Sequence, residues 1–121
     1  MTKPKRKFKS LPKSMEIYCD TLAGVKFADS QLTAVQPGQA VRLVHEKSNR
    51  FDENAIRVDT LDGVKLGYIK KRDTHILHNA KANGAKFQAF IRSYNPTANS
   101  WEQIVVVVYR ENTPAEIDKP L

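Results

Sequence analysis

The chain has 121 residues, of which 40% are hydrophobic, so it can build one compact core but not two. Its single cysteine, Cys19, excludes an internal disulfide framework and is typical of a reducing compartment. No apolar run approaches the roughly 20 residues of a membrane-spanning helix, and no apolar segment follows the basic start to make a signal peptide. We therefore expect a one-domain intracellular protein of the cytoplasm, nucleoid or nucleus, without a membrane partner. The sequence leaves its oligomeric state open.

Positive charge is concentrated at the start of the chain. The formal net charge is +7, and six lysines and arginines precede the first acidic residue, Glu16. Residues 14–121 therefore carry a net charge of only +1. We predict that residues 1–14 form a disordered basic arm. Such an arm is either a solvated tail or a segment that contacts phosphates and adds salt-dependent affinity.

The first half of the chain predicts strands separated by turns. Residues 16–27 have the composition of a strand, with a bulge or close backbone approach at Gly24. A loop follows and ends at Pro37-Gly38, where proline presets φ and glycine accepts the positive φ of a type II turn. In residues 41–46 apolar and polar side chains alternate with the period of two expected for a strand with one buried face.

The next segments predict a hairpin and a helix. Residues 55–58 form a strand, and Leu61-Asp62-Gly63 makes a tight turn into a strand over residues 64–69. Asp73 then offers a helix N-cap, and Gly84 ends the helix after about three turns, through the left-handed conformation that glycine tolerates.

Residues 86–94 and 103–109 complete the strands. The run 104–108 is β-branched throughout, which predicts that both faces of this strand are covered. Trp101 is expected to pack in the core or against a hairpin. Residues 111–121 contain two prolines and few apolar groups, so we predict a flexible C-terminal tail. The chain is therefore expected to be mainly β with one or two short helices.

The most specific feature is the polar loop over residues 48–54, which combines amide, carboxylate, guanidinium and aromatic side chains. Residues 49–58 follow the pattern Asn-x-aromatic-Asp-x-Asn-Ala-Ile-x-Val, and residues 63–69 follow Gly-x-x-x-Gly-aromatic-aliphatic. This combination resembles the motif of the HIRAN domain family. The resemblance covers about residues 21–109. It implies a small OB-like or SH3-like β-barrel over residues 15–110 that captures the 3′ end of single-stranded DNA.

The resemblance assigns a role to Asp52, which would accept a hydrogen bond from the terminal 3′-hydroxyl. The alternative is that Asp52 only caps the turn by accepting backbone N–H bonds. Asn49 would either bridge a loop carbonyl or define the pocket. Asn54 is expected to be structural, because an amide directly before the next strand suits a residue that pins the loop.

Aromatic side chains are needed to stack on bases. The resemblance places Phe27 and Tyr68 against the terminal base, Phe51 in the pocket loop and Tyr94 near the rim. The family commonly has tyrosine at the position of Phe51, so a hydroxyl is missing here. The alternative for each ring is core packing.

Cations are needed to bind the phosphates near the DNA end. Lys70, Lys71 and Arg72 lie beside the predicted start of the helix, where a bound phosphate would meet both the lysines and the first N–H groups. Lys26 replaces an arginine of some relatives, which keeps the charge and loses the bidentate fork. The alternative is a solvated basic edge.

No catalytic, cofactor or metal site is expected. His75 and His78 are three residues apart, without a third ligand at a recognisable spacing, and a solvated helix surface is the simpler interpretation. We predict a non-catalytic module that binds the 3′-hydroxyl end of single-stranded DNA and targets a helicase, nuclease or remodelling partner. The alternatives are a general single-stranded nucleic-acid binder driven by the basic tail, and a protein-interaction module.

Overall fold

The computed structural model describes residues 15–25 and 35–111 of the chain. The predictions for the basic arm, for Lys26 and Phe27, and for the tail beyond Glu111 lie outside the described residues. None of the helices in the described ranges has the length and apolar character of a membrane span.

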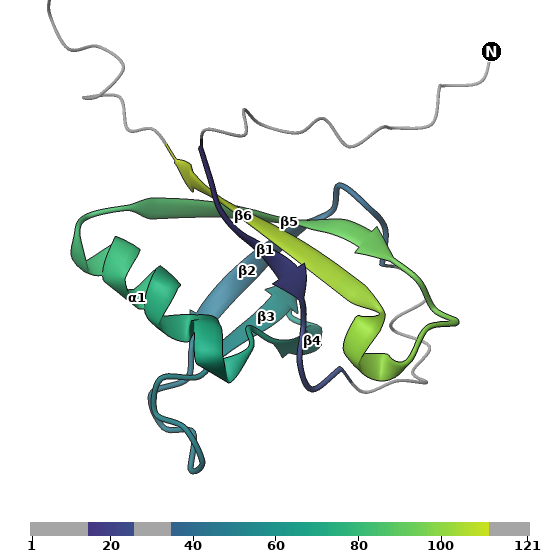
Figure 1. Ribbon diagram of the computed structural model, residues 1–121, viewed down its shortest axis with the longest axis horizontal. Coiled ribbons are helices and arrows are strands. Elements are labelled where there is room, and N and C mark those ends of the chain that lie inside the picture. The colour runs from purple at the N-terminus through teal and green to yellow at the C-terminus, as the bar shows by residue number, and fades with distance from the viewer. Residues whose placement is uncertain (1–14, 26–34, 112–121) are drawn as a thin grey trace, which may run out of the picture.

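Six strands, one α-helix and two short 3-10 helices make up the described fold. In chain order they are β1 (Glu16–Thr21), β2 (Ala40–His45), β3 (Ile56–Thr60), β4 (Lys65–Tyr68), η3 (Lys71–Asp73), α1 (Thr74–Ala82), β5 (Lys86–Tyr94), η4 (Ser100–Glu102) and β6 (Ile104–Glu111). The strands form one antiparallel sheet in the order β1-β6-β5-β2-β3-β4, which curls into a half-barrel with α1 at one side (Figure 1). The prediction of a mainly β, OB-like architecture is confirmed.

The first strand is shorter than predicted. β1 ends at Thr21, and the backbone turns at Gly24, where φ is +64°. Before that bend, Ala23 and Tyr68 exchange two backbone hydrogen bonds of 2.8 Å each. This bridge places the end of β1 beside the end of β4.

Gly67 is required by this bridge. A Cβ atom at position 67 would lie 2.7 Å from the carbonyl oxygen of Ala23 and 3.1 Å from a methyl group of Val25. Only glycine permits the two backbones to approach so closely. The glycine of the Gly-aromatic motif is therefore explained by packing.

The helix forms where the sequence predicted it, with Asp73 as its N-cap, but the side-chain capping bond is absent. The carboxylate of Asp73 accepts a hydrogen bond from the hydroxyl of Tyr18 on β1 at 2.8 Å instead. Leu77 is almost fully buried, which anchors the helix to the barrel. The tertiary bond between the helix and β1 has therefore replaced the local cap.

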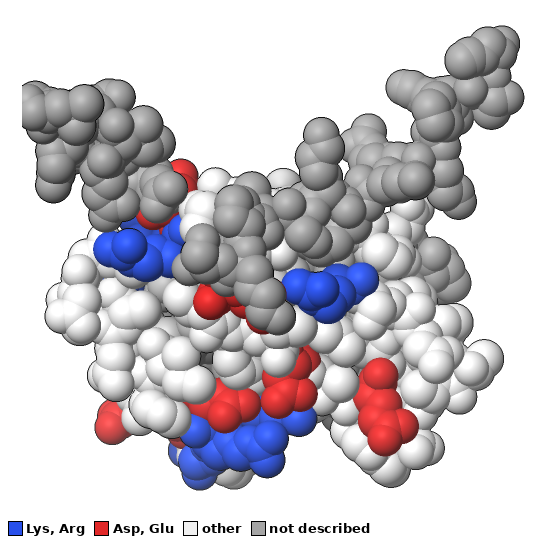
Figure 2. All heavy atoms as spheres, turned by 45° about the horizontal axis from the view of Figure 1, so that its top comes forward, with Lys and Arg blue, Asp and Glu red and all other residues white. Residues whose placement is uncertain are grey.

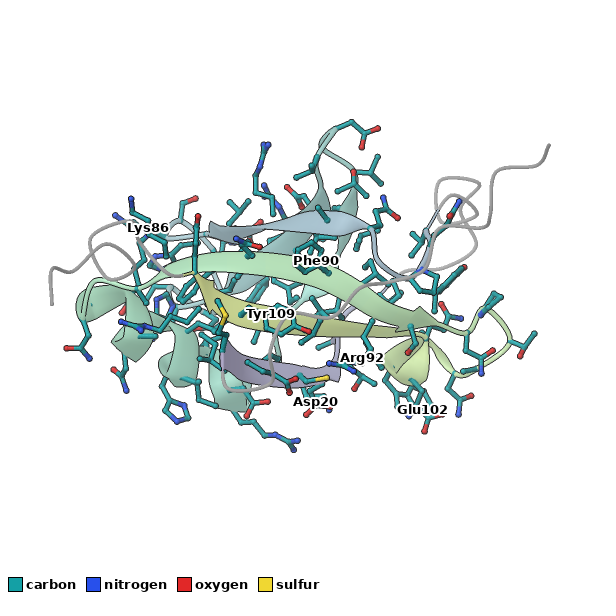
Figure 3. The ribbon with its side chains drawn as sticks, turned by 90° about the horizontal axis from the view of Figure 1, so that it is seen from above. Asp20, Lys86, Phe90, Arg92, Glu102 and Tyr109 are labelled. Atoms are coloured by element: carbon teal, nitrogen blue, oxygen red, sulfur yellow. The ribbon has the colours of Figure 1, made fainter. Side chains whose placement is uncertain are left out.

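The core lies on the concave face of the sheet. It consists of Tyr18 from β1 and mostly aliphatic side chains from the other strands and α1, with Leu22, Val58, Ile91, Ile104, Val106 and Val108 fully buried. Val107 and Tyr109, which alternate with the core residues of β6, are buried as well. This confirms that most of β6 is covered on both faces. The ring of Tyr109 lies 6.1 Å from that of Phe90 on the adjacent strand β5 (Figure 3).

Candidate nucleic-acid interface

Strands β2, β3 and β4 present a polar face opposite the core. Val44 lies directly opposite Arg57, and Arg57 lies directly opposite Tyr68. Directly paired residues share a face, and Glu46 and Asp59 join it because side chains two positions apart along a strand point the same way. This face carries the side chains that connect the sheet to the polar loop over residues 48–54, the motif loop.

Glu46 is the centre of a hydrogen-bond network on this face. Its Oε1 accepts hydrogen bonds from Asn49 Nδ2 and from the Tyr68 hydroxyl, each at 2.9 Å. Its Oε2 accepts one from Arg57 Nη1 at 2.7 Å. The guanidinium of Arg57 also donates to both carboxylate oxygens of Asp59, at 2.8 and 2.9 Å. One carboxylate therefore joins the motif loop, the aromatic residue of β4 and the middle of β3.

The members of this network shift each other's pKa. The hydrogen bond from Asn49 is the main cause that lowers the pKa of Glu46, and the bonds from Tyr68 and Arg57 add to it against the opposing effect of burial. The pKa of Arg57 is raised, first by its hydrogen bonds to Asp59 and then by those to Glu46. Glu46 and Arg57 are therefore both charged near neutral pH.

The motif loop between β2 and β3 is closed by its own side chains and projects from the sheet beside α1 (Figure 1). Asn49 Oδ1 accepts the backbone N–H groups of Phe51 and Asp52, at 2.8 and 2.9 Å. Asp52 Oδ1 accepts the N–H of Asn54 at 2.9 Å. Asp52 thus caps the turn with one oxygen. Its second oxygen, Oδ2, makes no hydrogen bond among the described residues and remains available to a ligand.

Two histidines hold the far side of the loop. His45 Nε2 lies 2.8 Å from the carbonyl oxygen of Glu53, and His78 Nε2 lies 2.9 Å from that of Asn54. A carbonyl oxygen only accepts, so both rings donate through Nε2. Their centroids are 4.4 Å apart. The expectation that His78 belongs to a solvated helix surface is wrong, because this side chain ties α1 to the loop.

The tip of the loop is exposed to solvent. The ring of Phe51 is 86% exposed, and the guanidinium carbon of Arg50 lies 5.9 Å from its centroid. On the sheet, Lys65 Nζ lies 4.7 Å from the centroid of the Tyr68 ring. The rings of Phe51 and Tyr68 thus each have a cation beside them, an arrangement suited to bases and phosphates.

Comparison with known proteins agrees with this geometry. Residues 20–110 match the sequence model of the HIRAN domain. The chain belongs to the HIRAN domain family. A search of the curated proteins gives no match. Family membership supports a role as a DNA-binding module.

Two solved structures share the fold of this HIRAN domain. A structural-genomics protein of Lactobacillus plantarum is 26% identical, with a TM-score of 0.62, and the alignment covers 78% of this chain and 95% of that one. The HIRAN domain of human HLTF is 17% identical, with a TM-score of 0.62 and coverage of 85% and 84%. The curled sheet is therefore the fold that the family model implies.

The cations before α1 are less available than the sequence indicated. Lys70 Nζ donates to Asp20 Oδ1 at 3.1 Å, and Arg72 lies 3.7 Å from Asp20 Oδ2 and 3.6 Å from Asp73. Burial alone would raise the pKa of Asp20, but hydrogen bonds from the Thr21 backbone N–H and from Lys70 outweigh it and lower the pKa. Lys71 is exposed and has none of these ion pairs among the described residues. A phosphate would therefore compete with Asp20 for Lys70.

Tyr94 does not join the motif loop. It packs against the core at the end of β5, which lies across the molecule from the loop in Figure 1. Trp101, which was expected to pack in the core or against a hairpin, is 61% exposed on η4, so that prediction is wrong. A single tryptophan between two strands gives no periodic signal that distinguishes packing from exposure.

Sequence reasoning missed Glu46, Arg57 and His45 as parts of this site. Glu46 lies two residues before the motif loop, and Arg57 alternates with the buried Ile56 and Val58 of β3. That pattern indicated a solvent face without indicating a shared hydrogen-bond network. On the face drawn in Figure 2, acidic groups separate the lysine and arginine groups.

Proposed function

We propose that this HIRAN domain binds the 3′-hydroxyl end of single-stranded DNA and, without catalysis of its own, targets a helicase, nuclease or remodelling partner to that end. The observation that carries the proposal is that the two carboxylate oxygens of Asp52 have different roles. Oδ1 is used inside the loop, and Oδ2 forms no hydrogen bond among the described residues. A fixed acceptor beside an exposed ring, that of Phe51, suits a terminal hydroxyl next to a base.

The neighbouring residues support the same ligand. The ring of Tyr68 is held by its bond to Glu46, which also holds Asn49 and so fixes the loop that carries Asp52. Lys65 beside Tyr68 and the exposed Lys71 offer charges for the adjacent phosphates. An ammonium that contacts phosphate contributes affinity without sequence information. The ligand class that fits is therefore a DNA chain end of any sequence.

The test is fluorescence anisotropy with a short single-stranded oligonucleotide that carries either a 3′-hydroxyl or a 3′-phosphate. We expect tighter binding of the hydroxyl form, and Asp52→Ala should remove about tenfold of that affinity, because a hydrogen bond to a charged group is lost. Glu53→Ala is the matched control, since it removes the same charge from the next, exposed position. Equal binding of both oligonucleotides by the wild type would contradict end recognition.

A second function is favoured by the charge distribution. Six of the positive charges precede residue 14. The N-terminal basic arm alone would then bind the backbone of single-stranded nucleic acid. Removal of residues 1–13 separates the two functions. An end-reading domain keeps its preference for the 3′-hydroxyl after this deletion, whereas a tail-driven binder loses most of its affinity.

A further inference from the structure

The half-barrel is open between β2 and β5. These strands form ladder pairs only at Ala40–Phe90 and Val41–Ala89. β2 continues to His45 and β5 starts at Lys86, so both strands extend past the last pair. Each is hydrogen-bonded on its other side, β2 to β3 and β5 to β6. Residues 42–45 and 86–88 therefore face each other as two strand edges with no ladder between them.

An apolar groove lies between these edges. It has a volume of about 420 Å³ and is lined by residues from β2, β3, α1 and β5. Its apolar lining includes the buried Val41, Ile56, Leu77 and Ala89 and the half-buried Phe87. The apolar floor of the groove lies on the core side of the sheet, whereas the network of Glu46 lies on the opposite face. The groove adjoins the proposed DNA site at Arg42, which pairs with Asp59 in the ladder, and at His45 and His78.

The rim of the groove is basic. Arg42, Lys81 and Lys86 are exposed lining residues, and no acidic residue lines the groove. Lys86 lies at the start of β5, at the α1 end of the sheet (Figure 3). A ligand that buries apolar side chains against the apolar lining, the floor of the groove, and carries negative charge toward the basic rim would complement both.

We propose that this groove binds an extended peptide of a partner protein, in which aliphatic and acidic residues alternate, as an added strand between β2 and β5. An entering strand would pair with the main-chain groups of residues 42–45 or 86–88, since unpaired strand edges bind extended peptides in this way. Its alternate side chains would point to opposite sides, apolar ones to the floor and acidic ones to the rim.

A peptide fits the groove better than a nucleic acid does. Bases require exposed aromatic faces for stacking. Of the three rings in the lining, Phe87 is half-buried, and the imidazoles of His45 and His78 are hydrogen-bonded to the motif loop. Main-chain N–H and C=O groups alternate along a strand edge and complement another strand, whereas a phosphate backbone offers only acceptors. The groove and the motif loop also share His45 and His78, which line the one and bond to the other.

The test uses the full chain and a synthetic peptide, acetyl-Glu-Val-Glu-Ile-Glu-Val-Glu-amide, followed by amide chemical shifts in NMR. We expect saturable shifts in residues 42–45 and 86–88. The double variant Lys81→Glu/Lys86→Glu should weaken binding by about tenfold, because both rim charges are reversed. Lys47→Glu, an exposed charge reversal outside the lining, should bind the peptide like the wild type. Both variants change exposed residues, and their amide spectra report whether the fold is intact.

Two altered peptides test the mode of binding. A peptide with lysine in place of glutamate should bind at least about tenfold more weakly, and so should one whose alternate backbone nitrogens are methylated. At about 1 mM peptide even a weak complex, with a Kd near about 1 mM, would be detected. Absence of amide shifts at that concentration would overturn the proposal. Shifts of the same amides caused by an oligonucleotide instead of the peptide would assign the groove to nucleic acid and also overturn it. Shifts that appear on raising the protein concentration alone would assign it to a second copy of the chain.

Discussion

The hydroxyl of Tyr68 donates a 2.9 Å hydrogen bond to Glu46 Oε1, the same atom that accepts the Asn49 amide. The aromatic side chain on the sheet and the motif loop are thus joined through one oxygen. Asn49 in turn fixes the backbone N–H of Asp52. Glu46 therefore positions both the motif loop and the ring of Tyr68.

Replacement of Glu46 by alanine should destabilise the fold and weaken DNA binding together. The change removes the acceptor of three hydrogen bonds and leaves Arg57 with Asp59 alone. The free energy of unfolding should fall by about 1 to 3 kcal/mol, since three hydrogen bonds between half-buried groups are lost at about 1 kcal/mol each. Tyr68→Phe, which removes one of these bonds and keeps the ring, should cost about 1 kcal/mol in urea unfolding. An unchanged unfolding midpoint for Glu46→Ala would contradict the role of the network.

Acid should lower the free energy of unfolding, because protonation of Glu46 weakens this network. The pKa of Glu46 is lower in the folded chain than in the unfolded chain, where it is about 4.3. The ionised carboxylate therefore stabilises the fold fully at pH values above the unfolded-state pKa. This stabilisation is lost as pH falls through the folded-state pKa. Asp20 acts in the same direction. Unfolding free energies measured from about pH 7 to pH 3 should therefore fall below about pH 4. In Glu46→Gln this fall should be smaller, and an identical profile would refute the assignment.

Gly67→Ala should disrupt the bridge between β1 and β4. The added Cβ would lie 2.7 Å from the Ala23 carbonyl oxygen, so the two backbones must separate. We expect a loss of about 1 to 3 kcal/mol, typical of overpacking. Gly63→Ala is the comparison, because that position has positive φ and open space around it, so its cost is the backbone strain alone, about 1 kcal/mol. Thermal unfolding of both variants measures the difference.

Two buried tyrosines should respond differently to loss of the hydroxyl. The hydroxyl of Tyr18 donates to Asp73, and burial followed by this bond raises its pKa. Tyr18→Phe should cost about 1 kcal/mol. The buried hydroxyl of Tyr109 has no hydrogen-bond partner among the described residues, so Tyr109→Phe should be neutral or stabilising by up to about 1 kcal/mol. Urea unfolding of both variants in parallel tests this contrast, and a larger loss for Tyr109→Phe would contradict it.

Local patterns sufficed to predict most of the fold. Alternation located β2, β-branched residues located β6, and turn chemistry located Gly63 between β3 and β4. The use of the Asp73 carboxylate depends on a contact with Tyr18, 55 positions earlier in the chain. Such contacts leave no periodic signal in the sequence.

The site was predicted only as far as the motif extends. Asn49, Asp52 and Tyr68 are connected through Glu46, which the motif does not include. The ion pair of Lys70 with Asp20 joins residues 50 positions apart, which lie close together beside the bridge between Ala23 and Tyr68. When the partner of a charged residue lies far away in the sequence, the neighbouring residues do not indicate that the charge is neutralised.

The most direct test of end recognition compares a linear single-stranded oligonucleotide with a covalently closed circle of the same sequence, both titrated against the chain lacking residues 1–13. The circle presents the same bases and phosphates but no terminal hydroxyl. The account predicts that the linear form binds at least about tenfold more tightly and that Asp52→Ala removes the difference. Equal affinity for circle and linear DNA would contradict the central claim and leave a general single-strand binder.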